Sequence, residues 1–178
     1  MMNSSTEKGF TLLEALVTVV VISIGLLGLL GLQTVSIANT QTSAARTNAS
    51  VAADSMADRV RSNEAAASKG DYAYDSPFPA PPSEPKPLCV GGTNCTAAQM
   101  AAYDFYEWNT SLDQLLPNGR GYLKCSATSG TQCLAYTITV AWSERDRGSN
   151  GTSDSDTTDR CAGLDSVKDR CFQTVVRP

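Results

Sequence analysis

The chain has 178 residues and a formal net charge of −4, with a pI near 4.8. This length suits one modest domain plus an anchor, and the acidic balance gives no general electrostatic reason to bind nucleic acid. The sequence contains no histidine. The commonest general base and metal ligand are therefore missing, and we expect neither enzymatic activity nor a cofactor or metal.

A carboxylate opens the most apolar stretch of the chain. A short polar leader ends at Gly9, and Phe10, Thr11 and two leucines lead directly to Glu14. A charge at the head of an apolar helix is costly in lipid, so its presence indicates a function.

The residues that follow predict a membrane-spanning helix. Residues 15–32 are interrupted only by Thr18, Ser23 and three glycines, and a helix of that length spans about 27 Å. We place the transmembrane segment at about residues 12–32. A cleaved secretory signal is disfavoured because the apolar run is long and the nearest small-residue cleavage site, around Ala44, comes too late.

The helical pattern continues beyond the apolar run. Small and apolar residues recur at spacings of three, four and seven, and no proline occurs before Pro77. We therefore predict one spine helix over residues 10–67, whose second half is amphipathic and packs on a globular head. The residues on this face are Ala38, Ala45, Ala49, Ala52, Met56 and Val60.

The remainder, residues 68–178, predicts a small α+β head. Residues 76–87 are proline-rich and read as a stiff surface loop. Thr96 and Gln99 form a capping box that opens a short helix over 97–116, with Trp108 in the core. Alternating patterns then predict antiparallel strands at about 121–127, 134–143 and 171–176.

Six cysteines follow the predicted membrane segment. An even number there indicates disulfides in an oxidising compartment. A zinc site is disfavoured because no C-x-x-C motif and no histidine occur. Six cysteines allow about fifteen connectivities, and proximity in sequence favours the pairs Cys89–Cys95, Cys125–Cys133 and Cys161–Cys171.

One polar loop carries three closely spaced carboxylates, Asp154, Asp156 and Asp159. Such a set could bind calcium. The full EF-hand pattern is absent, because no bidentate glutamate follows at the right distance. A solvated loop is the favoured interpretation, and calcium binding stays open.

The leader, the Gly-Phe-Thr-Leu-Leu-Glu sequence at residues 9–14 and the apolar helix resemble the type III signal of type IV pilins and pseudopilins. The resemblance implies a pilin-like α+β fold, with a long spine helix packed on a small disulfide-stapled antiparallel head. Three features are more specifically similar to PilV-type minor pilins, the type IV pilus modification proteins: Leu-Glu-Ala-Leu-Val at 13–17, Ile-Gly-Leu-Leu-Gly at 24–28 and the tryptophan-bearing helix.

This resemblance implies roles for individual residues. Prepilin peptidase would remove leader residues 1–9 by cutting between Gly9 and Phe10, and Phe10 would become the N-methylated mature N-terminus. Glu14 would meet the N-terminal ammonium of a neighbouring subunit, or its own. A paired carboxylate among apolar helices fixes their axial register, whereas an unpaired one is expensive.

The implied function is a minor pilin that primes assembly of a type IV pilus and enters its tip-associated complex. The protein would cross the inner membrane once, with its head in the periplasm, and then join the fibre at the cell surface. Implied partners are prepilin peptidase, the major pilin and other minor pilins through their spine helices, and a tip adhesin as a candidate. The alternative is a minor pseudopilin of a type II secretion system.

Overall fold

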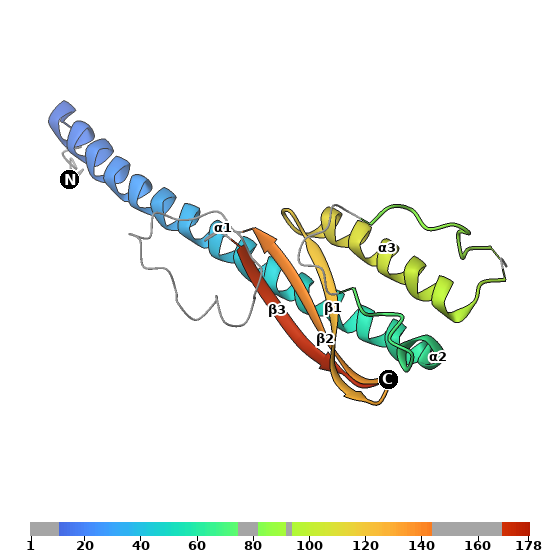
Figure 1. Cartoon of the computed structure of the whole chain (residues 1–178). Coiled ribbons are helices and arrows are strands. Elements are labelled where there is room, and N and C mark those ends of the chain that lie inside the picture. Colours follow the sequence, from blue (N-terminus) through green and yellow to red (C-terminus); the bar gives the residue numbers. More distant parts are fainter. Residues whose placement is uncertain (1–10, 75–81, 92–93, 144–168) are drawn as a thin grey trace, which may run out of the picture. The chain divides into compact units, whose positions relative to one another are not determined.

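The computed structural model describes residues 11–74, 82–91, 94–143 and 169–178. The chain forms two compact units, residues 1–42 and 43–178. The longest element, α1, runs from Leu12 to Ser62 and supplies helix to both units (Figure 1). Each unit is described separately below.

In the first unit, α1 is an uninterrupted helix without a single buried side chain between residues 12 and 42. It continues through Gly25, Gly28 and Gly31, and a methyl group added at any of these glycines would meet nothing within 4 Å. Residues 12–42 therefore form no core among themselves, and their large apolar side chains are exposed.

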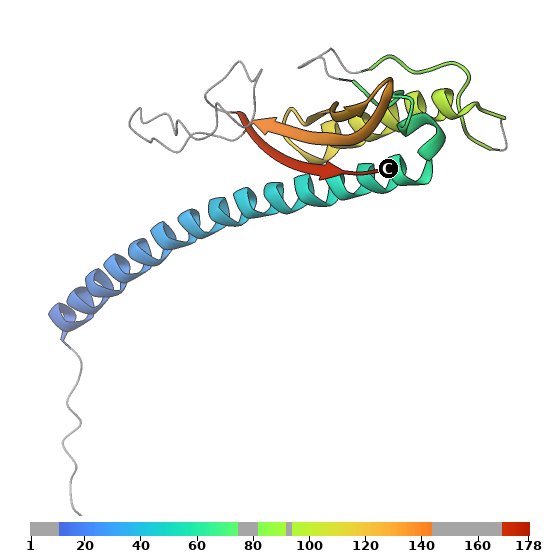
Figure 2. The same ribbon diagram turned by 60° about the horizontal axis from the view of Figure 1, so that its bottom comes forward.

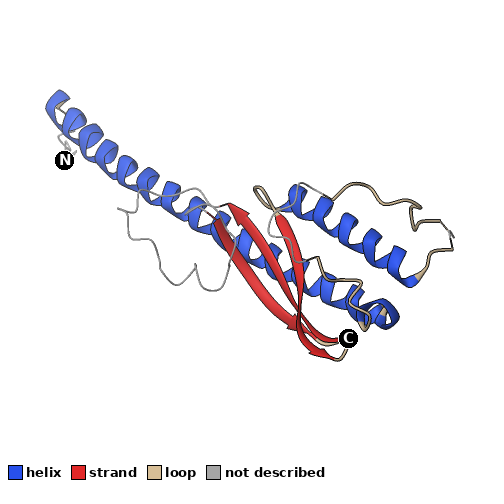
Figure 3. Cartoon of the chain, viewed as in Figure 1, coloured by secondary structure: helices blue, strands red, loops and turns tan. Residues whose placement is uncertain are grey.

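The second unit contains the end of α1, α2 (Glu64–Ala67), α3 (Ala97–Leu115) and a three-stranded antiparallel sheet (Figure 3). The strands are β1 (Arg120–Ser129), β2 (Gln132–Ser143) and β3 (Asp169–Val176), in the order β1-β2-β3. The expected α+β architecture is therefore confirmed: a long apolar N-terminal helix and an antiparallel sheet with disulfides.

The core of the second unit lies between α1 and the sheet. Figure 2 shows the sheet lying along the part of α1 that belongs to this unit. Small residues line most of the buried face of α1, and large side chains on β2 fill the space between the helix and the sheet. The buried residues on α1 are Ala49, Ala52, Ala53, Met56, Ala57 and Val60, and those facing them on β2 include Tyr136, Ile138 and Val140.

The spine helix is shorter than the sequence predicts. We expected one helix to residue 67, whereas α1 ends at Ser62 and α2 begins at Glu64. Asn63 lies between them with φ −120° and ψ 57°. Its side-chain amide donates to the Tyr72 hydroxyl (3.2 Å) and to the Ala97 carbonyl (2.9 Å). These tertiary hydrogen bonds accompany the break that local propensity does not reveal.

A polar cluster joins α1 to α3 beside this break. The Tyr72 hydroxyl donates to the Asp104 carboxylate (2.6 Å), which also accepts from the Arg59 guanidinium (3.1 Å). Glu107 is a second hydrogen-bonded partner of Arg59. Burial, and then the hydrogen bond to Asp104, raise the pKa of Tyr72 above its usual range. For Arg59, burial alone would lower the pKa, but the pairing with Glu107 and Asp104 outweighs it.

Replacing Tyr72 with phenylalanine should destabilise the head by about 1–2 kcal/mol, since the ring is fully buried and Asp104 loses one of its donors. Thermal unfolding of the detergent-solubilised chain, followed by near-UV circular dichroism, measures the loss. Tyr103→Phe is the matched control, because no hydrogen bond to the Tyr103 hydroxyl is found in the described residues. Equal stability of the two variants would contradict this account.

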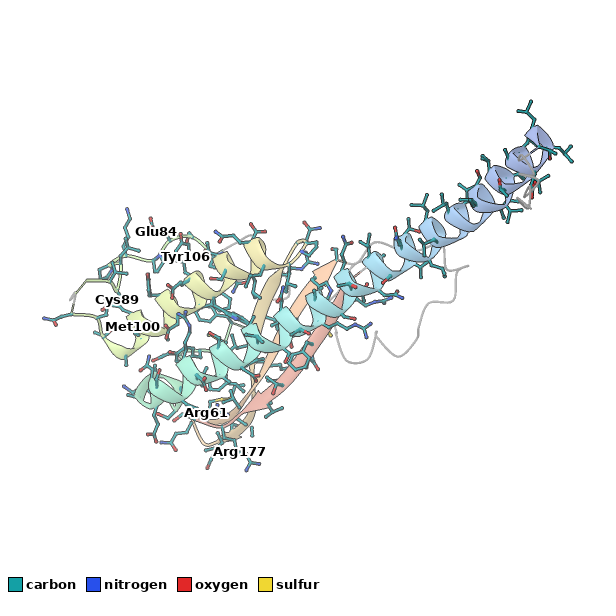
Figure 4. The ribbon with its side chains drawn as sticks, turned by 180° about the vertical axis from the view of Figure 1, so that it is seen from behind. Arg61, Glu84, Cys89, Met100, Tyr106 and Arg177 are labelled. Atoms are coloured by element: carbon teal, nitrogen blue, oxygen red, sulfur yellow. A yellow bond between two sulfur atoms is a disulfide. The ribbon has the colours of Figure 1, made fainter. Side chains whose placement is uncertain are left out.

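Two complete disulfide bonds lie within the described residues. Cys89 is bonded to Cys95 in the loop before α3, where Figure 4 labels Cys89, and Cys125 is bonded to Cys133 across the β1–β2 hairpin. These are two of the three pairs expected from proximity. Cys171 on β3 is also disulfide-bonded, and its expected partner Cys161 lies outside the described residues.

Candidate functional site

The start of α1 is built around Thr11. Its side-chain hydroxyl accepts a hydrogen bond from the Glu14 amide (3.3 Å). Its carbonyl accepts from the amides of Glu14 (3.1 Å) and Ala15 (3.2 Å). Thr11 therefore occupies the N-cap position, where a side-chain oxygen satisfies an amide that has no partner within the helix.

Glu14 stands three residues after this cap, in the first turn of α1. Its side chain is exposed, and within the described part of the chain its carboxylate makes no hydrogen bond or ion pair. No other charged residue occurs between Lys8 and Arg46. Among the described residues the carboxylate is therefore an isolated negative charge at the start of an apolar helix, and no described side chain pairs with it.

The predicted processing site, Gly9 and Phe10, lies outside the described residues. The bounds of α1 still constrain it, because the first helical residue is Leu12. The bond between Gly9 and Phe10 thus precedes the first residue of α1 in the sequence.

An apolar surface follows the carboxylate. The large aliphatic side chains between Leu12 and Ile37 are 50% to 92% exposed, far more than a folded domain leaves to water. The hydroxyls in this stretch turn back to their own helix: Thr18 donates to the Ala15 carbonyl, and Ser23 to that of Val19. By length and composition α1 could cross a membrane, and hydroxyls bonded in this way do not oppose insertion.

Within the second unit, α3 is hydrogen-bonded to α1 through Trp108. Trp108 on α3 is 3% exposed, and its indole N–H donates to the Ala52 carbonyl of α1 (2.9 Å). The core role expected for Trp108 is therefore confirmed. The Asn109 side chain accepts from the Gly121 amide (2.9 Å), which fixes α3 to β1.

Sequence reasoning singled out Glu14 but gave Thr11 no role. The missing signal is a Thr-x-x-Glu spacing at residues 11–14, the pattern of a capping box. It was recognised at Thr96, where both halves of the box are formed. The calcium candidates Asp154, Asp156 and Asp159 lie outside the described residues, and no group of three potential metal ligands occurs among the residues that are described.

Comparison with known protein families gives two matches. Residues 4–30 match the prokaryotic N-terminal methylation motif, and residues 31–106 match the family of the type IV pilin Tt1218. The matches are contiguous and cover residues 4–9 of the leader, α1, α2 and the first part of α3. No curated protein and no solved structure matches the chain significantly.

Proposed function

We propose that the chain is a minor type IV pilin that primes pilus assembly, because residues 31–106 match the family of the type IV pilin Tt1218 and residues 4–30 match the N-terminal methylation motif. It is a structural protein and not an enzyme. As a prepilin with an apolar N-terminal helix, it undergoes prepilin peptidase processing and assembles into a pilus. The proposal adds that it acts in a tip-associated complex of the PilV type.

The observation that carries this proposal is the isolated Glu14 carboxylate on a capped, exposed apolar helix. Removal of leader residues 1–9 would create a positive charge at Phe10. When spine helices bundle away from water, an unpaired carboxylate is expensive, while one that meets an N-terminal ammonium is compensated. The pair would select one axial stagger between otherwise uniform apolar helices.

The proposal assigns a role to each part of the chain. About residues 12–32 hold the protein in the inner membrane before assembly, with the head, residues 68–178, in the periplasm. After assembly the spine helix contacts the spine helices of the major pilin and of other minor pilins. The three features shared with PilV-type proteins support the finer assignment, including the helix that carries Trp108.

Processing can be tested directly. The mature protein from assembled pili should begin at N-methyl-phenylalanine, Phe10, because the cut precedes that residue. Mass spectrometry of the N-terminal peptide measures both the cut and the added methyl group. An intact leader on protein recovered from pili would refute the proposed processing site.

A gene deletion can test whether the protein serves a type IV pilus or a type II secretion system. Deleting the gene should abolish or strongly reduce surface pili and twitching motility while leaving type II secretion unchanged. Restoring the gene on a plasmid is the control. A secretion defect with normal piliation would instead identify a pseudopilin, the alternative that shares the same processing motif.

A further inference from the structure

We propose that the edge of β3 that faces away from β2 binds an extended segment of another protein as a fourth, antiparallel strand, with a carboxylate of that segment opposite Arg177. This binding site lies in the head alone and goes beyond the proposed function, because it requires neither the charge of Glu14 nor a choice between pilus and secretion system. The partner is defined by its chemistry: an extended segment with β-branched side chains and one acidic residue.

The hydrogen bonds of the sheet show which amides of β3 are free. β2 lies between β1 and β3 (Figure 1), and the Ser143 amide of β2 points away from β3, since it donates to the Pro117 carbonyl (2.9 Å). This direction alternates along an antiparallel strand, so Thr174 lies opposite a β2 residue that turns toward β3. The amides of Gln173 and Val175, on either side of Thr174, therefore point away from the sheet, and neither has an acceptor within the described part of the chain.

The other edge of the sheet is already closed by the head itself. On β1 the Gly121 amide donates to the Asn109 side chain (2.9 Å). The Leu123 amide donates to the Tyr74 carbonyl (3.1 Å). Beyond Cys125 the register with β2 shifts, and such irregularities discourage the addition of a strand. A partner strand is therefore expected at β3 and not at β1.

β3 lacks the features by which proteins usually protect an exposed edge. Its eight residues pair with β2 without a register shift, and they include neither lysine nor proline. Val175 is 61% exposed, and Gln173 is exposed as well. A regular, unprotected edge of this length is a template for another strand. An added strand would satisfy both outward amides through main-chain hydrogen bonds.

The side chains along this edge define which segment fits. Val175 and Gln173 lie on one face of the sheet, where the Gln173 side-chain amide donates to the Thr139 hydroxyl (3.0 Å). Arg177 directly follows β3, is exposed, and makes no hydrogen bond or ion pair within the described residues. Across neighbouring strands, pairs of β-branched side chains and pairs of opposite charge are favourable. The segment that fits therefore carries a β-branched residue opposite Val175 and, two positions earlier, a carboxylate opposite Arg177.

The test measures binding of a fluorescein-labelled peptide, Ser-Glu-Thr-Val-Thr-Thr-Ser, to the detergent-solubilised full chain by fluorescence anisotropy. Its valine and glutamate would lie opposite Val175 and Arg177. Val175→Pro removes an outward amide and spares the bonds to β2, because this amide does not take part in them. We expect proline to weaken binding at least about tenfold. Val175→Thr keeps the amide and the branched shape, and this matched control should bind as the wild type does.

Two further comparisons separate strand pairing from non-specific adhesion. In the peptide, N-methylation of the valine amide, which would face β3, should abolish binding. N-methylation of the threonine that follows, whose amide would point away from β3, should leave binding unchanged. Arg177→Glu should weaken binding about threefold, and a peptide with lysine in place of its glutamate should restore it.

Three results would overturn the inference. Undiminished binding to folded Val175→Pro would show that the β3 edge is not the site; if that variant does not unfold cooperatively, the two methylated peptides decide on the wild-type chain. Equal effects of the two methylated peptides would exclude strand pairing. A dimer of the full chain that Val175→Pro dissociates in analytical ultracentrifugation would identify a second copy as the occupant instead of another protein. None of these measurements depends on pilus incorporation, which tests the proposed function separately.

Discussion

Incorporation into pili is expected to fall at least about tenfold when Glu14 is replaced by alanine, while the amount of protein in the inner membrane stays unchanged or rises. The carboxylate is the one charged side chain between Lys8 and Arg46. Nothing else in that stretch can distinguish one axial stagger of the helices from another by charge. Alanine also inserts into lipid more readily than glutamate, so the variant should reach the membrane.

The measurement is quantitative immunoblotting of sheared pili against whole membranes. Glu14→Gln separates charge from shape and should behave like alanine, whereas Glu14→Asp keeps the charge on a shorter side chain and should lose less. Thr18→Val is a matched control in the same helix, because the Thr18 hydroxyl bonds only to the Ala15 carbonyl of its own helix. Wild-type incorporation of Glu14→Ala would show that the charge does not set the register.

The architecture was predictable because its signals are local and periodic. The apolar run, the recurring small residues of α1 and the alternation in β2 each report a face that must be buried. The capping box at Thr96 gave the start of α3, which runs over Ala97–Leu115 against an expected 97–116. The hairpin pair Cys125–Cys133 followed from proximity, because short loops leave few other partners.

The features that escaped prediction depend on contacts far apart in sequence. The helix break at Asn63 coincides with hydrogen bonds from its side chain to Tyr72 and Ala97, and no local sequence pattern predicts those two partners. The ion pair between Arg59 on α1 and Asp104 on α3 joins residues that are 45 positions apart in the sequence. The Thr11 cap is different, because its Thr-x-x-Glu spacing is local and is visible in the sequence.

The head contains a position where one added methyl group should be strongly destabilising. Gly121 on β1 is buried and lies opposite Val140. A Cβ there would stand 2.2 Å from Cη2 and 2.3 Å from Cζ3 of the Trp108 ring, and 2.8 Å from Leu112. These distances are far below van der Waals contact, so the ring, the strand or both must move.

The Trp108 ring cannot move away from a methyl group at residue 121 without disturbing other contacts, so we expect a large loss of stability. Trp108 is 3% exposed, its N–H is committed to the Ala52 carbonyl, and the Gly121 amide is itself bonded to Asn109. Gly121→Ala should therefore cost about 3 kcal/mol and lower Tm by more than about 10 °C. Near-UV circular dichroism during thermal unfolding of the detergent-solubilised chain reports the transition.

Two further variants decide whether the steric account of Gly121 is right. Adding Trp108→Phe to Gly121→Ala shortens the ring that causes the clash, so the double variant should be more stable than the sum of the single losses implies. Gly28→Ala, whose new methyl group meets nothing within 4 Å, should leave the unfolding of the head unchanged. Additive losses in the double variant would mean that β1 fails for a reason other than contact with Trp108. Coupling between the two sites would instead locate the cost of the methyl group at the α3–β1 contact that fixes Trp108 against α1.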